Sequence, residues 1–268
     1  YTRLQNPTND AVAAKITAME GGVAGLLTAS GQAANFFALF NICEAGDHFI
    51  ASSAIYGGTY NLFGVTMKKM GIDCTFVDQN LSEAELDQYF RPNTKAVFGE
   101  TITNPTVSVL DLEKFARLAH RHGVPLLVDN TFATPVNCRP FEWGTDIVTH
   151  STTKYMDGHG VTVGGCIVDS GNFDWLAHKD KFPGLTKPDP SYHGLVYAEA
   201  FGKGAYITKA TAQLMRDFGS TQAPQNAFYL NLGLESLPLR MQRHCQNGLA
   251  VATFLSQQEQ VAWIDYPD

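Results

Sequence analysis

The sequence lacks any long apolar run and any cluster of basic residues. No stretch approaches the roughly 18 uninterrupted apolar residues of a membrane helix, and the N-terminus has no charged region followed by an apolar core. The net charge is -7, and the lysines and arginines form no run that could follow a nucleic acid backbone. We therefore expect no membrane segment, no nucleic acid partner, and a small molecule as the ligand.

Paired cysteines are also missing. The chain has five cysteines, an odd number, and they are scattered without a C-x-x-C pair: Cys43, Cys74, Cys138, Cys166 and Cys245. This pattern is typical of reduced thiols in the cytoplasm. We expect no disulfide and no metal site.

The length of 268 residues, with 44% hydrophobic and 17% charged residues, is typical of a globular protein with a sizeable core. We expect a large domain over residues 1–230 and the beginning of a C-terminal domain over 231–268. The helical pattern there should break at Gly233 and Pro238. Because the chain starts directly in a motif-like segment and stops without a recognisable terminal element, we expect it to be a fragment.

From residue 23 onward, short apolar segments alternate with segments of helical periodicity. The strand-like segments are 23–27, 48–51, 73–77, 95–100, 124–129, 146–149 and 161–168. The helix-like segments are 11–20, 32–40, 59–70, 82–90 and 110–122, and the one from Ser82 opens with the Ser-x-x-Glu pattern of a capping box. Such alternation predicts an α/β fold with a mostly parallel sheet flanked by helices on both faces.

Polar residues follow the ends of several strand-like segments. They are Ser30-Gly31-Gln32, Tyr56-Gly57-Gly58, Glu100 with Asn104, Asp129-Asn130-Thr131 and Ser151-Thr152-Thr153-Lys154. Because the carboxyl ends of parallel strands meet at one edge of a sheet, we expect these side chains to form one site.

Ser30 lies at the start of the predicted helix 32–40, where free N–H groups and the helix dipole favour an anion. Neither G-x-G-x-x-G nor G-x-x-x-x-G-K occurs there, so neither a dinucleotide nor a nucleoside triphosphate is indicated. Packing of the helix on small residues is an equally good explanation of this segment, and both remain open.

Two charged side chains follow buried strand-like segments. Lys154 has hydroxyls beside it and glycines beyond it, which suits an amine used as a nucleophile toward an aldehyde. Asp129 follows the apolar segment 124–128, where a carboxylate needs a cationic or proton-donating partner. The alternatives are a lysine with its amine in water at a strand end and an aspartate that caps the next loop.

Pyridoxal 5'-phosphate needs an anion cradle, a carboxylate, an aromatic side chain beside glycines and a lysine amine. Its phosphate suits a helix N-terminus, its ring nitrogen must stay protonated, and its aldehyde condenses with lysine. The residues therefore favour a pyridoxal phosphate site. The competing class is a nucleotide-binding α/β module in which Lys154 only touches phosphate.

Several separated motifs resemble those of the Cys/Met-metabolism family of pyridoxal phosphate enzymes, and the resemblance covers nearly the whole chain. The motifs are Tyr1-Thr2-Arg3-Leu4-Gln5-Asn6-Pro7-Thr8, Ser30-Gly31-Gln32-Ala33, Tyr56-Gly57-Gly58-Thr59-Tyr60, Val128-Asp129-Asn130-Thr131-Phe132 and His150-Ser151-Thr152-Thr153-Lys154-Tyr155. The resemblance implies the large domain of a fold type I pyridoxal-phosphate-dependent transferase.

The resemblance also implies a role for each matching residue. Lys154 is the lysine that condenses with the cofactor, Asp129 is the partner of its ring nitrogen, and Tyr56 stacks on its ring. Gly31, Gln32, Ser151 and Thr153 then hold its phosphate. Because they follow the strand-like segments at the same edge, we also expect Ser30, Glu100, Asn104 and Thr131 to bind the cofactor. Tyr1 and Arg3 match a pair that reaches the cofactor phosphate of a neighbouring subunit, which implies an obligate dimer, usually within a tetramer. Tyr1 and Tyr56 are also the phenols expected to assist proton transfer.

Within the family, three segments are similar to the sulfhydrylases that act on O-acetylhomoserine: Tyr56 to Phe63, Pro190 to Gly194 and Gly233 to Arg240. This implies methionine biosynthesis by γ-replacement, in which sulfide or a small thiol displaces acetate. The alternatives are a γ-lyase of the methionine γ-lyase or cystathionine γ-lyase/synthase type, and an inactive, truncated partner subunit. The family's arginine for the substrate carboxylate lies beyond the end of this chain.

Overall fold

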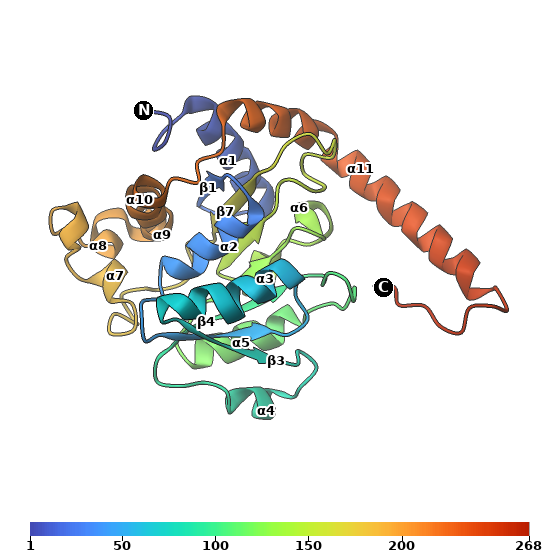
Figure 1. The fold of residues 1–268 in the computed structure, drawn as a ribbon, viewed down its shortest axis with the longest axis horizontal. Coiled ribbons are helices and arrows are strands. Elements are labelled where there is room, and N and C mark those ends of the chain that lie inside the picture. The colour runs from blue at the N-terminus through green and yellow to red at the C-terminus, as the bar shows by residue number, and fades with distance from the viewer. Residues whose placement is uncertain (268) are drawn as a thin grey trace.

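The structure, a computed structural model, describes residues 1–267 (Figure 1). Within these residues one sheet contains the strands β1 Ala24–Thr28, β2 His48–Ser52, β3 Asp73–Val77, β4 Thr94–Glu100, β5 Leu126–Asp129, β6 Ile147–His150 and β7 Gly165–Asp169. Their order across the sheet is β1-β7-β6-β5-β4-β2-β3. Each strand overlaps one of the strand-like segments of the sequence.

Most strand pairs in the sheet are parallel. Strands β3, β2, β4, β5 and β6 run in one direction, whereas β7 is antiparallel to both of its neighbours, β6 and β1. The expectation of a mostly parallel sheet is confirmed. The carboxyl ends of β4, β5 and β6, at Glu100, Asp129 and His150, therefore lie along one edge of the sheet.

Helices cover both faces of this sheet. The α-helices are α1 Pro7–Glu20, α2 Gly31–Phe40, α3 Gly57–Asn61, α4 Glu83–Asp87, α5 Leu112–Arg121, α6 Thr134–Asn137, α7 Pro183–Thr186, α8 Tyr197–Phe201, α9 Ala205–Lys209, α10 Arg216–Phe218 and α11 Pro224–Ser256. Wider or tighter helical turns are η1 Leu62–Thr66, η2 Met67–Met70, η3 Pro140–Trp143, η4 Pro190–Tyr192, η5 Gly202–Gly204 and η6 Ala210–Met215. The helix predicted over 59–70 is thus helical, but it passes from α3 through a wider turn in η1 to a tighter one in η2.

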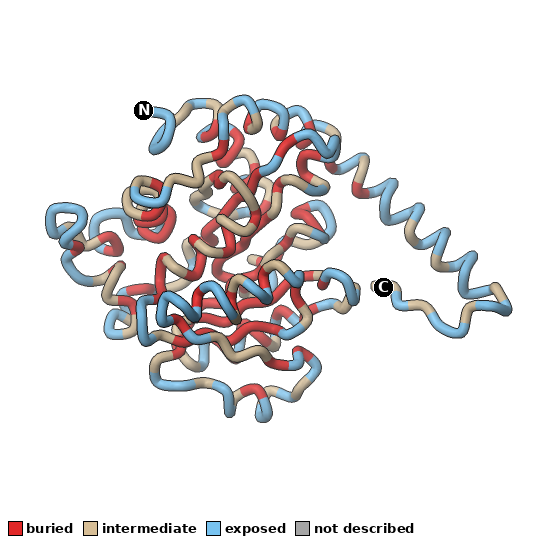
Figure 2. Tube along the Cα trace, viewed as in Figure 1, coloured by how far each residue is buried: buried red, intermediate tan, exposed pale blue. Residues whose placement is uncertain are grey.

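The side chains of β6 and β7 alternate between two hydrophobic cores, as the pleat of a strand requires. Val148 and Val168 pack with α1 and α11, whereas Ile147 and Ile167 belong to the larger core that includes Phe37 of α2. Helices α1 and α2 therefore lie on opposite faces of the sheet. Figure 2 shows buried residues concentrated along the strands.

Polar side chains mark where three helices begin. The Asn6 side chain accepts from the backbone N–H of Thr8 at 3.0 Å, and Ser30 Oγ accepts from that of Ala33 at 3.1 Å. Ser82 and Glu85 form the predicted capping box at the start of α4. Such caps satisfy backbone donors that have no partner within the helix.

Helix α11 does not break where the sequence suggested. The expected interruption at Gly233 and Pro238 is wrong, because one helix runs through both residues. Pro238 has no backbone N–H to donate, but Arg240 donates to the backbone carbonyls of Gly233 at 2.8 Å and Tyr155 at 2.6 Å. The bond to Tyr155 holds the helix to the body beyond the proline, whereas the bond to Gly233 lies within α11. The domain boundary near residue 230 stays a prediction.

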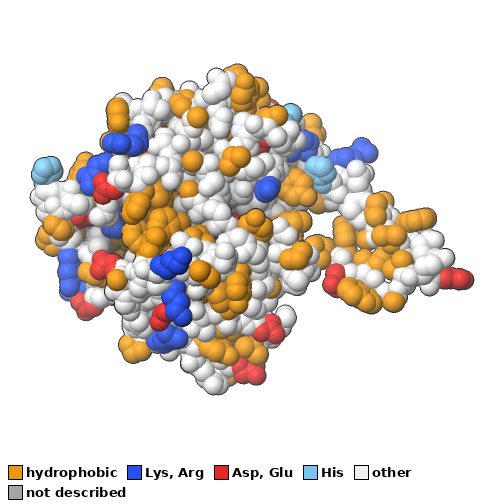
Figure 3. All heavy atoms as spheres, viewed as in Figure 1, with side chains coloured by type: hydrophobic (Ala, Val, Ile, Leu, Met, Phe, Trp, Pro, Cys, Tyr) orange, Lys and Arg blue, Asp and Glu red, His pale blue; other side chains and the backbone are white. Residues whose placement is uncertain are grey.

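The second half of α11 projects from the body, with the end of the chain folded back beside it (Figure 1). Large hydrophobic side chains are exposed there, including Leu249, Val251, Phe254 and Trp263, and Figure 3 shows hydrophobic atoms gathered on this projection. Within residues 1–267, no helix is long and apolar enough to span a bilayer. In the same residues the cysteines are free, and no cluster of three or more potential metal ligands occurs.

Candidate active site

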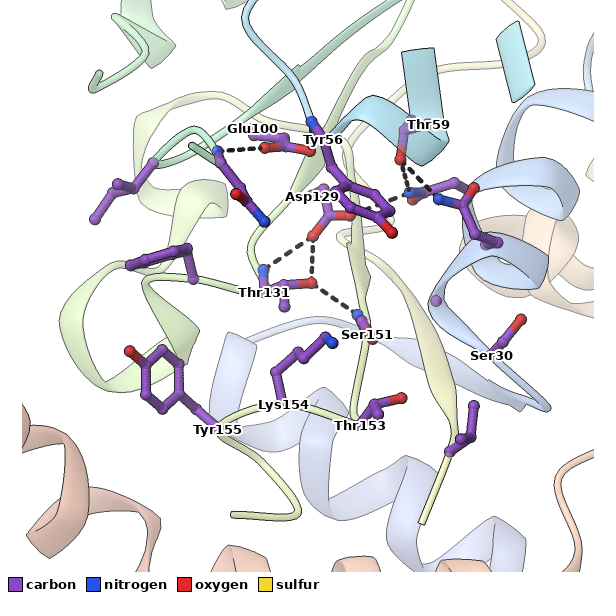
Figure 4. A pocket seen from close by; sticks show the side chains of 17 residues that line it. Ser30, Tyr56, Thr59, Glu100, Asp129, Thr131, Ser151, Thr153, Lys154 and Tyr155 are labelled. Carbon is purple, nitrogen blue, oxygen red and sulfur yellow. Dashed lines mark hydrogen bonds between the residues drawn. The ribbon is translucent and has the colours of Figure 1, made fainter. Parts of the chain in front are cut away.

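A cavity of about 570 Å³ opens at the carboxyl ends of the parallel strands. Its walls come from segments far apart in the sequence, and Figure 4 shows their side chains converging on one space. The lining residues are Ser30, Gly31, Gln32, Asn35, Tyr56, Thr59, Glu100, Ile102, Asn104, Asp129, Thr131, Phe132, Ser151, Thr153, Lys154, Tyr155 and Val163. At least one polar residue from each of the segments that follow the strands lines this cavity, whereas Asn130 and Thr152 do not.

Asp129, the last residue of β5, is held from two directions. Asn35 of α2 donates from Nδ2 to Asp129 Oδ2 at 3.1 Å. The backbone N–H of Thr131 donates to Asp129 Oδ1 at 3.0 Å, and the Thr131 hydroxyl donates to the same oxygen. Thr131 Oγ1 in turn accepts from the backbone N–H of Ser151 at 2.7 Å. The carboxylate therefore has a fixed orientation at the floor of the cavity (Figure 4).

Glu100 lies beside Asp129, because the two residues are register partners in β4 and β5. Its carboxyl group is 5% exposed and accepts from the backbone N–H groups of Tyr56 at 2.8 Å and Asn104 at 3.2 Å. Burial, and then the neighbouring Asp129 carboxylate, raise the pKa of Glu100 to about 8. Glu100 is therefore largely protonated at neutral pH and adds little negative charge beside Asp129.

Lys154 lies in the turn that follows β6, and its side chain extends into the cavity toward Asp129 and Ser151 (Figure 4). Within the turn, the Lys154 carbonyl accepts from the N–H of Gly158 at 2.9 Å, and the Tyr155 carbonyl accepts from Arg240. Among the lining residues, all of which belong to the described part of the chain, Lys154 is the single cation. The amine is thus presented to a space that is otherwise neutral or acidic.

The start of α2 approaches the turn after β6 very closely. A Cβ on Gly31 would lie 2.5 Å from the Cβ of Ser151, so only glycine fits this position. Ser30 caps the helix next to it. Gln32 Nε2 donates to Thr59 Oγ1 at 3.1 Å, while Gln32 Oε1 is buried without a partner among the described residues.

These groups can hold an anion. A half-turn of the Gln32 amide would let Thr59 donate to Oε1 and would free the NH₂ group to donate into the cavity. Hydroxyl groups of Ser151 and Thr153 line the same side of the space, next to the N-terminal end of α2. A phosphate group fits such a set of donors.

Tyr56 precedes α3 and is 50% exposed, with its ring at the cavity. A Cβ on Gly58 would lie 2.5 Å from Tyr56 Cε1, so the absence of a side chain at Gly58 leaves space for the ring. In Figure 4 the ring lies in front of the Asp129 carboxylate. A flat aromatic ligand held at Asp129 could therefore stack against it.

The structure brings nearly all the predicted site residues together. Those that line the cavity are Ser30, Gly31, Gln32, Tyr56, Glu100, Asn104, Asp129, Thr131, Ser151, Thr153 and Lys154. Tyr1 and Arg3 do not: Tyr1 is 83% exposed, the Arg3 guanidinium lies over the Tyr1 ring, and the Arg3 carbonyl accepts from Thr221. The roles assigned to all of these residues stay predictions.

The cavity also contains residues for which no role was predicted from the sequence. They are Asn35, Thr59, Ile102, Phe132, Tyr155 and Val163. Asn35 lies one helical turn beyond Gly31, so helical periodicity was a signal for it. Phe132 and Tyr155 stand directly beside Thr131 and Lys154, and their position in the motifs was the corresponding signal.

Comparison with known proteins gives consistent similarities. Residues 1–268 match the model of the family described as Cys/Met metabolism PLP-dependent enzyme. The chain is 46% identical to homocysteine/cysteine synthase of Saccharomyces cerevisiae, over 100% of this chain and 60% of that protein. It is also 46% identical to O-acetyl-L-homoserine sulfhydrylase of Leptospira meyeri, over 100% of this chain and 62% of that protein. The chain thus spans about three fifths of these curated relatives.

A solved structure from Campylobacter jejuni has the same fold. That protein, described as a candidate O-acetylhomoserine (thiol)-lyase, superposes with a TM-score of 0.95 at 37% identity, over 99% of this chain and 64% of that one. It carries a pyridoxyl group attached to a lysine.

Proposed function

The chain belongs to the Cys/Met metabolism family of PLP-dependent enzymes, and from this we propose that the protein catalyses γ-replacement on O-acetyl-L-homoserine. Sulfide or a small thiol takes the place of acetate and gives homocysteine or methionine. One observation carries the proposal: Lys154, the single cation of the cavity lining, enters the same cavity as the oriented carboxylate of Asp129. The relatives named as sulfhydrylases and homocysteine synthases support the choice of substrate.

Pyridoxal phosphate, when bound, supplies an aldehyde that condenses with amines and a ring that accepts electrons from the substrate. Lys154 would hold the aldehyde, Asp129 the ring nitrogen and Tyr56 the face of the ring. Residues that would hold the phosphate or the remaining edges of the cofactor are Ser30, Gly31, Gln32, Glu100, Asn104, Thr131, Ser151 and Thr153. The close approach of α2 to Ser151 and the reorientable amide of Gln32 support this fit.

Lys154 and Asp129 have complementary tasks. When the substrate amine takes the place of Lys154 Nζ, the freed amine can accept the proton from the substrate α-carbon and help to move a proton at the β-carbon. Asp129 would place its carboxylate at the ring nitrogen and so favour the protonated form of that nitrogen. Glu100, with its pKa raised to about 8, would add little negative charge beside it at neutral pH.

We also propose that the site is shared between two copies of the chain in a dimer, within a tetramer. The anion cradle contains no arginine, and a phosphate dianion is most strongly bound by one. Arg3 and Tyr1 are exposed on their own subunit, which leaves them able to reach the cradle of a second copy. Tyr1 and Tyr56 would then be the phenols that assist proton transfer.

The apolar side chains on the projecting half of α11 support assembly, since large exposed apolar patches mark interaction surfaces. The proposed location is the cytoplasm, because free thiols are typical of proteins in a reducing compartment.

The test is to incubate the protein with O-acetylhomoserine, with and without sulfide, and to measure homocysteine and 2-oxobutanoate. We expect homocysteine and acetate as the main products at saturating sulfide, because a closed site that admits the thiol and excludes water favours replacement. Oxoacid as the main product under these conditions would indicate γ-elimination and would refute the sulfhydrylase activity.

A further inference from the structure

We propose that Glu20, the last residue of α1, is a positioning residue that holds the ends of three site-bearing strands from the opposite face of the sheet. The inference rests on the proposed function in one respect only, namely that the supported residues bind pyridoxal phosphate. Glu20 lies outside the cavity and its side chain is completely buried.

One oxygen of Glu20 joins two strands. Glu20 Oε1 accepts from Asn130 Nδ2 at 2.9 Å, directly after β5, and lies 2.6 Å from His150 Nε2 at the end of β6. His150 Nδ1 has no partner in the described chain, so Nε2 is the nitrogen that carries the proton and donates to Glu20. A buried carboxyl oxygen with two donors is a directional anchor, and the other oxygen, Oε2, is buried without a partner in the described chain.

Asn130 extends the connection to a third strand. Its Oδ1 accepts from the hydroxyl of Thr101, the residue after β4, at 2.6 Å, and its Nδ2 also donates to the carbonyl of Cys138 at 2.9 Å. Every polar atom of this side chain therefore has a partner. Glu20 and Asn130 together connect the ends of β4, β5 and β6 to α1.

Three residues of this hydrogen-bonded group, Thr101, Asn130 and His150, each stand next to a cavity residue in the chain. Thr101 follows Glu100, Asn130 follows Asp129, and His150 precedes Ser151. Successive side chains of an extended strand point to opposite faces. The cavity residues therefore face α2, as the bond from Asn35 to Asp129 indicates, while their neighbours face α1.

This arrangement fixes the spacing of the cofactor-binding groups. Asp129 ends β5 and Ser151 directly follows β6, and Thr131 bonds to both: it donates to the Asp129 carboxylate and accepts from the backbone N–H of Ser151. The common bond of Asn130 and His150 to Glu20 adds a side-chain connection to the backbone pairing of β5 and β6 at the same strand ends. Without Glu20, two buried donors lose their acceptor, and the strand ends must shift to find another.

The experiment compares Glu20→Ala and Glu20→Gln. The glutamine keeps an oxygen that can accept from both donors, whereas alanine does not. In metal sites, loss of such supporting partners weakens binding about 10- to 100-fold, and we expect a similar loss of pyridoxal phosphate affinity in Glu20→Ala, with most of the affinity retained in Glu20→Gln. Affinity is measured by titrating the cofactor-free proteins and following the absorbance of the bound cofactor.

A second readout needs no cofactor. In the cofactor-free protein, Glu20→Ala should raise amide hydrogen exchange in both 129–131 and 150–154, and Glu20→Gln should raise it much less. If Glu20→Ala does not fold, His150→Leu removes one donor and should loosen the same two segments.

The matched control is Asp169→Asn, which changes a different buried carboxyl group, at the end of β7. Asp169 of β7 pairs with Ile147 at the start of β6, whereas His150 lies at the other end of that strand. Asp169 is buried, and this burial raises its pKa to about 7. This variant should alter stability without altering cofactor affinity or amide hydrogen exchange at the two segments.

The positioning role would be overturned by one result. In that result, Glu20→Ala lowers the unfolding temperature but binds pyridoxal phosphate like the wild type, with unchanged amide hydrogen exchange. A wild type that binds no pyridoxal phosphate would instead overturn the proposed function, and the exchange comparison would still decide the role of Glu20.

Discussion

At the scale of the residue, Asp129 is the group on which the proposed withdrawal of electrons from the substrate into the cofactor ring depends. Asp129→Asn preserves the shape of the side chain and one carbonyl acceptor but removes the negative charge. We expect the variant to retain the cofactor and to lose about 10²- to 10³-fold in kcat/KM, the usual effect of removing one well-placed electrostatic partner. The measurement is steady-state kinetics together with the cofactor content per chain.

Asp78→Asn is the control for this change. Asp78 is an exposed carboxylate after β3 that accepts from the N–H of Asn80 at 2.9 Å and lines no part of the cavity. Its variant should have wild-type kinetics. Unchanged kinetics in Asp129→Asn as well would reduce Asp129 to a structural role.

Glu100 makes stability depend on pH. In the folded protein its carboxyl group keeps a proton up to about pH 8, whereas in the unfolded chain it releases the proton near its ordinary pKa of 4.5. Between these values the folded state binds more protons, so its contribution to stability is present below about pH 4.5 and is lost as the pH rises toward 8.

Glu100→Gln imitates the protonated form and should remove this dependence. We expect the free energies of unfolding of variant and wild type to converge near pH 5, and the variant to be more stable at pH 8 by at least about 1 kcal/mol, since one pKa unit corresponds to about 1.4 kcal/mol. The measurement is denaturant unfolding of both cofactor-free proteins across this range. A constant difference between them at all pH values would contradict the assignment.

At the scale of the element, α11 supports the turn that carries Lys154. Gly233 packs against this turn so closely that an added Cβ would lie 2.2 Å from the carbonyl oxygen of Asp157 and 2.6 Å from that of Met156. Gly233→Ala should therefore displace the turn, lower the free energy of unfolding by about 1–3 kcal/mol and weaken cofactor binding.

Gly248→Ala, in the same helix, is the matched control. Its Cβ would lie 3.4 Å from the Tyr266 side chain, an ordinary contact, and alanine favours a helix by up to about 1 kcal/mol over glycine. Urea unfolding should show a loss for Gly233→Ala and no loss for Gly248→Ala. If both substitutions raised the free energy of unfolding equally, Gly233 would not be packed tightly against the turn.

The elements themselves differ in how far the sequence predicts them. The strands were predictable because apolar, β-branched runs are bounded by turn residues, and the site residues were predictable because each follows such a run. The continuity of α11 was not, since the bond from Arg240 to Tyr155 that fastens the helix beyond Pro238 joins residues 85 positions apart in the chain. Glu20 gave no signal either, because its partners are 110 and 130 residues away in the chain.

At the scale of the whole molecule, the prediction is that each site takes Lys154 from one subunit and Arg3 from another. Arg3→Ala should weaken retention of pyridoxal phosphate by about tenfold or more, because it removes a bidentate bond to phosphate. Arg91→Ala, which removes an exposed arginine 3.7 Å from Asp73, is the control and should retain the cofactor.

Mixed dimers give the sharper form of this test. A dimer of an Arg3→Ala chain and a Lys154→Ala chain contains one site with both residues intact and one site with neither. At a cofactor concentration too low to saturate Arg3→Ala, activity should therefore rise when the two variants exchange subunits. Mixed dimers without activity, or a wild-type monomer with full cofactor occupancy, would contradict a shared site.

The central claim is that Lys154 is the residue to which pyridoxal phosphate is attached, and one measurement tests it most directly. The wild-type protein is loaded with the cofactor, reduced with borohydride, digested and analysed by peptide mass spectrometry. We expect a pyridoxyl group on the peptide that contains Lys154, and the loss of both this label and the visible absorption band in Lys154→Ala. A label on another lysine, such as the buried Lys209, or a wild type that takes up no label, would contradict it.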